Sequence, residues 1–396
     1  MSSTRGSTEG AAVVGYAHSP VSRNADVSLG ELTLRTVLEA VADAGLDKGD
    51  IDGFTTGALF PSSGGRAPVD GEHIVTSDWL VEHLGIQPRW LCGFQGIGQI
   101  CGSVVLAANA VSSGSADYVV VHRAMYNPPG RYHANSMTRA EGNAQWTAPH
   151  GFWGPPAHIA LPYMEYMQRY GATREEMATV VEGARQAGSR VPWSHWYQNP
   201  LESGEYLGAR MIADPISVLD CDIPITGVGA FVLTSAARAR DLPNRPVYVA
   251  GFAQGRSPST NGVGAWTLES IQEGGRAVAE ILWKSCGFGP EEVDVPQVYD
   301  GFSPFVYFWL EALGFCQEGT AHEYVQGSDI SPGLPFRVGG GALGNGRMHG
   351  VPQMLESYLQ LAGRAEDRQL DGVETAIACQ AAPNMGGVVA YTNVPV

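Results

Sequence analysis

Two segments in the second half of the chain contain residues that could carry acid–base chemistry. The first runs Val298-Tyr299-Asp300-Gly301-Phe302-Ser303-Pro304 and is typical of a strand that ends and a helix that begins, with Ser303 at the N-cap. Tyr299 and Asp300 are therefore expected at the carboxyl end of a strand, where α/β proteins bind ligands. Asp300 could alternatively do no more than cap the following helix. We include Ser303 among the expected substrate contacts.

The second segment, Gly339–Gly350, has the sequence GGGALGNGRMHG. Because glycine lets backbone N–H groups approach a ligand closely, this loop is predicted to contact substrate. The glycines expected to do so are Gly340, Gly341 and Gly346. His349 could act as a general acid or base, and Arg347 could bind an anion or lower the pKa of a neighbouring group. A purely structural tight turn is the alternative.

Cys379 is a further candidate, because a thiol at the end of a predicted strand could act as a nucleophile. A buried, inert cysteine is the alternative. The six cysteines include no C-x-x-C pair, and the ten histidines include no H-x-H or H-E-x-x-H pattern. No metal site is therefore predicted, and catalysis is expected to rely on the acid, base and thiol groups above.

Composition excludes several other classes of chemistry. The net charge of −16 disfavours a nucleic-acid-binding surface, which needs clustered Lys and Arg. The only lysines are Lys48 and Lys284, so Schiff-base and pyridoxal-phosphate chemistry, which need a buried lysine amine, are not expected. The sequence shows neither an apolar run long enough to span a membrane nor a secretory signal, and we therefore expect a cytoplasmic protein with free thiols.

The chain of 396 residues contains an internal duplication that would position these groups. Residues 42–52 align with 284–294, and the order Gly-rich loop, helix and strand in 96–121 recurs in 339–379. Two similar halves with mostly parallel sheets are therefore expected to pack around shared buried helices. The N-termini of those helices would face one cavity and could hold an oxyanion. Chance similarity of two common βα units is the alternative.

The stretch between the halves, residues 124–200, is rich in Trp, Tyr, His, Pro and Gly. Helices are expected at about 159–170 and 173–187. We interpret this stretch as an inserted cap over the site, although an oligomer interface would also favour aromatic residues. The expected division is therefore 1–123 with 201–260 for the first half, 124–200 for the cap, and 261–396 for the second half.

These features together resemble the thiolase superfamily over nearly the whole chain. The resemblance rests on the duplication, the Gly339–Gly350 loop, the run Val298–Ser303 and the terminal run ACQAAPNMGG at 378–387. The branch it is most similar to contains the non-specific lipid-transfer and sterol-carrier-protein-x thiolase-like proteins. This resemblance implies an α/β class and a duplicated five-layer αβαβα fold with an inserted cap segment.

The chain departs from the thiolase pattern at the positions that matter for thiolysis. Ile97 stands where thiolases carry their nucleophilic cysteine, and Gly98 beside it remains an expected substrate contact. Arg347 falls on the histidine of the Gly-His-Pro motif, and Tyr299 to Phe302 falls on the Asn-Glu-Ala-Phe run. Only Cys379 keeps its residue type. Without the first cysteine, the usual acyl-enzyme is not expected to form.

Steroid side-chain-cleaving aldolases are a branch with such a repurposed site, and this chain resembles them in the two segments described first. The resemblance implies a CoA-thioester carbon–carbon lyase that performs a retro-aldol cleavage of a β-hydroxyacyl-CoA. Tyr299, Asp300 or His349 would take the hydroxyl proton, with Arg347 lowering the pKa of Tyr299 if the two are close. The alternatives are a thiolase or acyltransferase that uses Cys379 or Cys92, and a non-catalytic scaffold subunit.

The low charged fraction of 16% and the aromatic middle stretch predict a homodimer. The resemblance implies a small OB-fold/zinc-ribbon partner protein in addition. Coenzyme A is expected only as part of the substrate, with no other cofactor.

Overall fold

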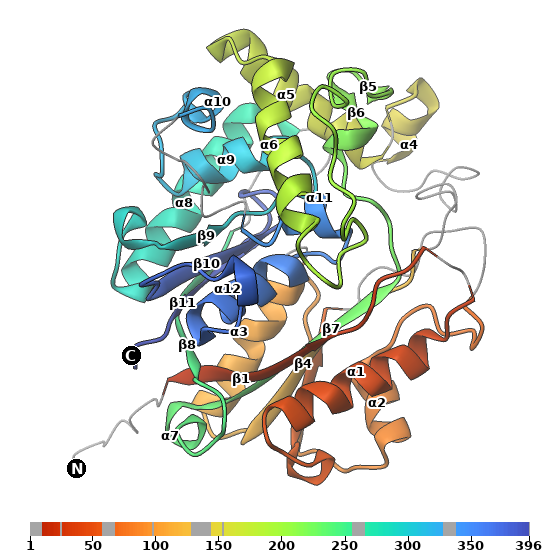
Figure 1. The fold of residues 1–396 in the computed structure, drawn as a ribbon, viewed down its shortest axis with the longest axis vertical. Coiled ribbons are helices and arrows are strands. Elements are labelled where there is room, and N and C mark those ends of the chain that lie inside the picture. The colour runs from red at the N-terminus through yellow and green to blue at the C-terminus, as the bar shows by residue number, and fades with distance from the viewer. Residues whose placement is uncertain are drawn as a thin grey trace.

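A computed structural model describes residues 10–23, 26–57, 68–96, 99–127, 144–152, 154–255, 266–327 and 338–395. Within these ranges nine strands form one sheet in the order β3-β2-β4-β7-β1-β8-β11-β10-β9 (Figure 1). The strands are β1 (Ala11–His18), β2 (Gly53–Thr56), β3 (Trp90–Gly93), β4 (Tyr118–Met125), β7 (Gly227–Ser235), β8 (Val247–Gln254), β9 (Val295–Gln297), β10 (Thr375–Gln380) and β11 (Gly387–Thr392). A separate pair consists of β5 (Met211–Ala213) and β6 (Ile216–Ser217).

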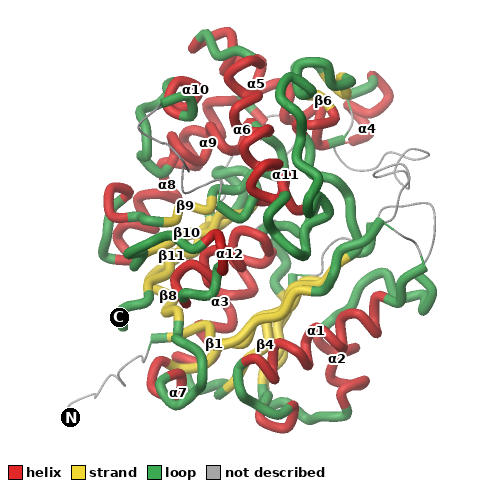
Figure 2. The backbone as a smooth tube through the Cα atoms, in the orientation of Figure 1, coloured by secondary structure: helices red, strands yellow, loops and turns green. Residues whose placement is uncertain are grey.

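Helices lie on both sides of this sheet and in a group at one end of the molecule (Figure 2). They are α1 (Leu29–Asp43), α2 (Ser77–Leu84), α3 (Gln99–Ser112), α4 (Ala144–Thr147), α5 (Pro155–Tyr170), α6 (Arg174–Gly188), α7 (Ala236–Ala239), α8 (Leu268–Cys286), α9 (Pro304–Ala312), α10 (Ala321–Tyr324), α11 (Gly341–Asn345) and α12 (Val351–Ala362). No helix in the described ranges combines the length and hydropathy needed to cross a membrane.

The strand pairing confirms the duplication. In the first half β2 runs parallel to β4, and β4 and β1 both run antiparallel to β7. In the second half β9 runs parallel to β10, and β10 and β8 both run antiparallel to β11. The halves meet where β1 pairs with β8 through Ala12↔Tyr248 and Val13↔Val247.

The expectation of mostly parallel sheets is wrong, because most of these strand pairs are antiparallel. The physical reason is visible at β10 and β11. Only a short turn, residues 381–386, joins them. Parallel neighbours need a crossover of a dozen or more residues, whereas a turn this short joins antiparallel strands.

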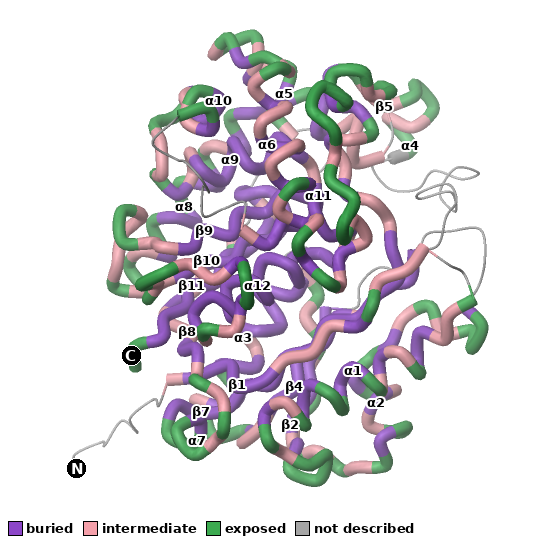
Figure 3. The backbone as a smooth tube through the Cα atoms, in the orientation of Figure 1, coloured by how far each residue is buried: buried purple, intermediate pink, exposed green. Residues whose placement is uncertain are grey.

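Two helices form the middle layer of the fold, as the duplication predicts. Nearly every residue of α3 and α12 is buried, and one apolar cluster joins them to strands of both halves (Figure 3). The helix α3 is largely apolar, as a helix in the interior should be, and the buried polar side chains of α12, such as Gln353 and Gln360, are hydrogen-bonded. By contrast α1 buries one face, at positions such as Thr33, Val37 and Ala40, and packs on the outer side of the first half. With α8 on the outer side of the second half, the order of layers is αβαβα.

The middle stretch contributes α5 and α6, close to the two expected helices. The helix α5 begins earlier than expected, at Pro155, because Pro155 and Pro156 fit the first turn, where a missing N–H costs nothing. The helix α6 packs directly against α11: a Cβ atom at Gly188 would lie 1.9 Å from the carbonyl oxygen of Gly344. The middle stretch therefore supports the Gly-rich segment.

Candidate active site

Asp300 holds the start of the Gly-rich segment. Its carboxylate accepts the backbone N–H of Ala342 at 2.6 Å, the backbone N–H of Leu343 at 3.2 Å and the side-chain amide of Gln353 at 2.7 Å. Asp300 thus caps α11, and not the helix α9 that follows it in sequence. The N–H groups of Ala342 and Leu343 are already bonded, so they do not serve as donors to an enolate.

Gly341 allows this close approach. A Cβ atom there would lie 2.4 Å from Asp300 Oδ2, and the φ angle of +56° is one that side-chain-bearing residues rarely adopt. Gly340 and Gly346 also have positive φ angles, and each lies against protein, Gly340 against Gly188 and Gly346 against Ile225. The packing of these glycines accounts for their residue type, and their contact with substrate stays a prediction.

Ser303 is occupied within the protein. Its hydroxyl donates to Asp220 Oδ1 at 2.5 Å, and its side chain makes no capping bond to α9. Contact of Ser303 with substrate likewise stays a prediction. The other two expected substrate contacts, Ile97 and Gly98, lie outside the described residues.

The carboxyl of Asp300 titrates near neutral pH. Burial raises its pKa to about 7, although the hydrogen bonds from Ala342, Leu343 and Gln353 each lower it. The neutral form cannot accept all three of these bonds as well as the ionised form does. A change of protonation at Asp300 would therefore weaken or strengthen the hydrogen bonds that hold the Gly-rich segment.

A second carboxyl, Asp222, lies beside it and was not recognised in the sequence. Its backbone N–H donates to the carbonyl oxygen of Gly301 at 3.1 Å. Burial and the nearby charge of Asp300 raise the pKa of Asp222 well above its ordinary range. Asp222 stands in a run, Asp220-Cys221-Asp222, that carries no motif, so only the fold could bring it next to Asp300.

A buried arginine on β4 contacts His349. Arg123 donates through Nη2 to His349 Nδ1 at 3.0 Å and through Nη1 to the carbonyl oxygen of Gly57 at 2.8 Å. Gln99 Oε1, at the start of α3, lies 3.0 Å from the same Nδ1. Arg123 can only donate to Nδ1 and Gln99 Oε1 can only accept from it, so the two contacts require opposite protonation states of this nitrogen, and the tautomer of His349 depends on which contact it keeps. His349 itself has a φ angle of +48°, which is uncommon outside functional sites and turns.

Arg123 was also missed by the sequence analysis, since it interrupts an otherwise apolar strand without any motif. It is only 1% exposed, and burial lowers its pKa to about 10. Its charge opposes a strong rise in the pKa of Tyr299, which burial causes and the charges of Asp222 and Asp300 increase. Tyr299 therefore keeps its proton near neutral pH and is a hydrogen-bond donor rather than a base.

Arg347 was expected to lower the pKa of Tyr299. The cation that does so is Arg123, and burial outweighs its effect. Burial and the charge of Arg123 lower the pKa of Arg347 itself to about 9, and its backbone N–H donates to Ile223 O at 2.9 Å. The structure thus brings Tyr299, His349 and Arg347 together around Arg123, and Asp300 lies next to Tyr299.

The thiols nearby are poor nucleophiles. Cys379, on β10, is fully buried, and burial together with nearby Cys101 raises its pKa well above the ordinary range. Burial raises the pKa of Cys221 in the same direction, with Asp220 and Asp222 adding to the effect. A thiol that stays protonated does not attack a thioester readily.

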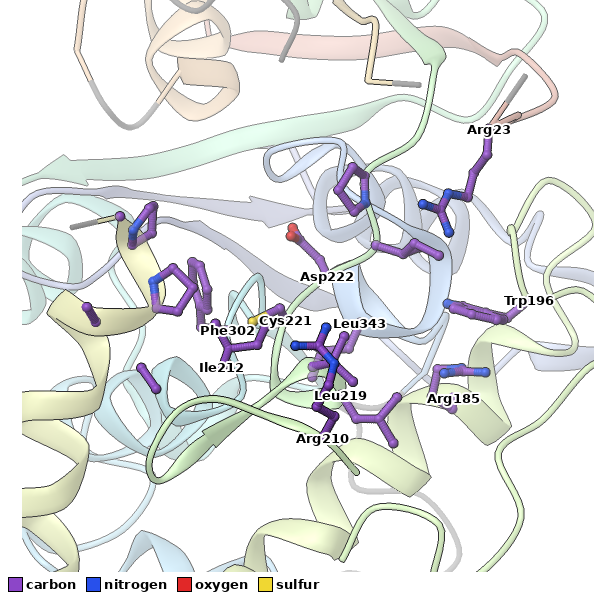
Figure 4. Close-up of a pocket in the computed structure, with 18 of the residues that line it drawn as sticks. Arg23, Arg185, Trp196, Arg210, Ile212, Leu219, Cys221, Asp222, Phe302 and Leu343 are labelled. Atoms are coloured by element: carbon purple, nitrogen blue, oxygen red, sulfur yellow. The ribbon is translucent and has the colours of Figure 1, made fainter. Parts of the chain in front are cut away.

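A cavity of about 610 Å³ opens beside this cluster (Figure 4). Asp222 and Phe302 lie on its wall, and Leu343 from α11 closes part of it. Most of the remaining lining is apolar, but three arginines also contribute: Arg23, Arg185 and Arg210. A cavity of this size and character suits a largely apolar ligand that carries anionic groups.

Comparisons with known proteins identify the family of the chain. Residues 265–396 match the family model described as thiolase C-terminal domain-like. The chain is 34% identical to a 17-hydroxy-3-oxo-4-pregnene-20-carboxyl-CoA lyase of Mycobacterium tuberculosis, over 97% of each chain. It is 32% identical to a steroid side-chain-cleaving aldolase of Thermomonospora curvata, over 91% of this chain and 92% of the other.

Among solved structures, an Ltp2-ChsH2(DUF35) aldolase matches with a TM-score of 0.81 and 26% identity, over 97% of this chain and 98% of the other. An acetyl-CoA acetyltransferase of Syntrophomonas wolfei shares the fold, with a TM-score of 0.67 and 16% identity over 97% and 99%. The chain therefore belongs to the thiolase superfamily, in the branch that contains the steroid side-chain-cleaving aldolases.

Proposed function

We propose that this protein is a CoA-thioester carbon–carbon lyase that cleaves a β-hydroxyacyl-CoA by a retro-aldol reaction. The observation that carries the proposal is the composition of the cluster: His349, Tyr299 and Arg347 lie near Arg123 and the carboxyl of Asp222 lines the cavity, while Cys379 is buried and protonated. A protonated thiol disfavours acyl transfer through a thiolate, whereas the neighbouring acid and base groups favour proton transfer. The names of its relatives agree with a steroid as the acyl group.

The reaction needs one proton to be removed and one charge to be stabilised. A base takes the proton of the β-hydroxyl group, the Cα–Cβ bond breaks, and the thioester oxygen becomes an enolate oxygen until Cα is protonated. His349 and Asp300 are the groups proposed to move the proton, and the Tyr299 hydroxyl is proposed as a donor to developing negative charge. These steps call for no cofactor other than the coenzyme A of the substrate.

The direct test is to incubate the purified protein, with and without its DUF35-type partner, with a β-hydroxyacyl-CoA that carries a 17-hydroxysteroid side chain. Mass spectrometry should show a 17-ketosteroid and a shorter acyl-CoA in equal amounts, with no free CoA consumed. Consumption of free CoA would instead indicate thiolysis, the alternative reaction. The partner is included because a matching solved structure is a complex with such a domain.

Cys379→Ala is expected to keep kcat within about tenfold of the parent protein, because the proposed chemistry does not use a thiolate. Alkylation of the accessible thiols should likewise leave the cleavage largely intact. The measurement is steady-state kcat with the steroid substrate, and Tm should be recorded because the thiol is in the core. Loss of all activity on modification of a single cysteine would favour the acyl-enzyme route.

Arg185→Met is expected to raise KM for the acyl-CoA about tenfold while changing kcat less, since a charged hydrogen bond contributes about 1.5–3 kcal/mol. The guanidinium of Arg185 stacks 3.4 Å from the centre of the Trp196 ring, and its Nε is buried without a partner in the described part of the chain. We propose that it contacts a phosphate of coenzyme A. Arg190→Met is the control, because Arg190 is exposed and pairs with Asp367. Equal KM values in the two variants would contradict the assignment.

We also propose a homodimer in the cytoplasm. The strand β3 forms one edge of the sheet, and Leu91 on it is 41% exposed, which is a surface suited to a second copy. The six cysteine thiols are all free, which agrees with a reducing compartment. Light scattering at micromolar concentration should give twice the mass of the chain, and Leu91→Arg should shift it toward one chain. A monomeric parent protein would contradict the proposal.

A further inference from the structure

Asp222 is a buried carboxyl group that the reaction steps above leave unused. It lies on the wall of the cavity and is 8% exposed (Figure 4). Its Oδ2 is buried and has no hydrogen-bond partner among the described residues. A buried carboxyl oxygen without a partner is costly to keep, so its position at the cavity needs an explanation.

The backbone around Asp222 fixes the side chain relative to both functional segments. Cys221 forms an antiparallel bridge with Phe302, and Asp222 N–H bonds to Gly301 O, so this stretch is attached to the segment that carries Tyr299 and Asp300. One residue further, Ile223 O accepts the backbone N–H of Arg347 from the Gly-rich segment. The carboxyl therefore stands between the two segments that line the site.

The surroundings decide which of the two neighbouring carboxyls keeps a proton. Asp300 accepts three hydrogen bonds, which favour its ionised form, whereas Oδ2 of Asp222 accepts none in the described part of the chain. When two carboxyl groups lie close together, ionisation of one makes the other hold its proton much more strongly. Asp300 ionises first, and Asp222 remains the neutral acid.

The other titratable and charged groups near Asp222 do not reverse this order. Those facing it are Asp300, Tyr299 and Cys221, and those lining the same cavity are Arg23, Arg185 and Arg210. Tyr299 and Cys221 are neutral at physiological pH, because their pKa values are raised by burial. Within the described ranges Oδ2 of Asp222 has no hydrogen-bond partner, so none of the three arginines is bonded to it.

We propose that Asp222 is a catalytic residue of the lyase: in its neutral form it donates a hydrogen bond to the thioester oxygen of the substrate as that oxygen becomes an enolate. The Cα–Cβ electron pair forms the Cα=C bond while the carbonyl π pair moves onto the oxygen. The hydroxyl proton passes to the base and then to Cα. Asp222 therefore donates a hydrogen bond throughout and keeps its own proton. The assignment rests on the proposed lyase function and adds a donor to it.

The activity of Asp222→Asn distinguishes a neutral hydrogen-bond donor from a general base. An amide still donates a hydrogen bond, so Asp222→Asn is expected to keep kcat within about tenfold of the parent, whereas Asp222→Ala should lose about 10²–10³-fold. The loss of activity at high pH that follows deprotonation of Asp222 should be absent in Asp222→Asn. If Asp222 were a base, both variants would lose activity equally, and that result would overturn the proposal.

The matched control is Asp220, two residues away and also buried. It accepts hydrogen bonds from Tyr206 at 2.7 Å and from Ser303 at 2.5 Å, so Asp220→Asn should lower Tm, whereas Asp222→Asn should not. If Asp222→Asn lowers Tm as much as Asp220→Asn and slows turnover only in proportion to folded protein lost, Asp222 is structural and the proposal is wrong.

A measurement without substrate separates this inference from the proposed function. At about pH 8, where Asp300 is ionised, the infrared difference between the parent protein and Asp222→Asn should contain the C=O stretch of a neutral carboxylic acid. Absence of that band refutes the neutral acid even if the lyase is active. Presence of the band in a protein that cleaves no β-hydroxyacyl-CoA refutes the proposed function and, with it, the catalytic role.

Discussion

Replacing Asp300 with alanine is expected to lower kcat/KM of the cleavage by about 10²-fold or more. The carboxylate holds the N–H groups of Ala342 and Leu343 and the amide of Gln353, so its loss releases the start of α11 beside the cavity. Asp300→Asn should also be impaired, because an amide NH₂ would face N–H donors. Steady-state kinetics on correctly folded protein would measure both effects.

The pH dependence has a definite sign. Because the ionised form of Asp300 accepts three bonds and its pKa is about 7, activity of the parent protein should rise as pH passes through 7 and level off above it. In Asp300→Asn this limb should disappear. A pH profile identical in the parent and in Asp300→Asn would show that Asp300 does not control the reaction.

The contribution of Asp300 to the free energy of unfolding should fall as pH rises, whereas activity should rise. The folded-state pKa of Asp300 is raised above its ordinary value of 3.8, so ionisation favours the unfolded state. The stabilisation from Asp300 is therefore fully present below about 4 and is lost as pH rises through about 7. Relative to the parent, Asp300→Asn should gain in free energy of unfolding over this interval.

Asp294 offers a matched control at the other end of β9. Its Oδ2 also accepts two backbone N–H groups, from Glu374 at 2.8 Å and Thr375 at 3.0 Å, but it is partly exposed and precedes the strand rather than following it. Asp294→Asn should lower stability yet leave kcat/KM per folded molecule unchanged. An equal loss of activity in both variants would point to general instability rather than to the site.

Gly341→Ala is expected to have the second large effect, an almost complete loss of activity and a destabilisation of about 2–4 kcal/mol. The added Cβ would lie 2.4 Å from Asp300 Oδ2, so either the carboxylate or α11 must move. The φ angle of +56° adds backbone strain. Chemical denaturation and steady-state kinetics on the same preparation would measure the two losses together.

The control for strain alone is Gly372→Ala. Gly372 has a similar φ angle of +69°, but an added Cβ would meet nothing within 4 Å. This variant should lose only about 1 kcal/mol and keep its activity. If Gly341→Ala loses no more than Gly372→Ala, the contact between Gly341 and Asp300 does not determine the geometry of the site.

The sequence by itself determined the repeated order of elements and several of the residues that meet at the site. Local patterns sufficed for this: a glycine lies just beyond the end of α1, at Gly45, and another at the end of α8, at Gly287, and both helices carry apolar residues on one face. Tyr299-Asp300 and His349 stood out because a polar pair after a strand and an imidazole in a Gly-rich loop are unusual locally. Their catalytic roles remain predictions.

Only the tertiary structure decided what those residues contact. Arg123 lies 226 positions before His349 and Asp222 lies 78 before Asp300, and neither stands in a motif, so nothing local indicates that they meet. The alternative role of Asp300 was to cap α9, yet the helix it caps is α11, since helix ends accept any donor or acceptor that the fold brings near. The pKa shifts depend in the same way on burial and on charges distant in sequence, and burial is a property of the packed chain alone.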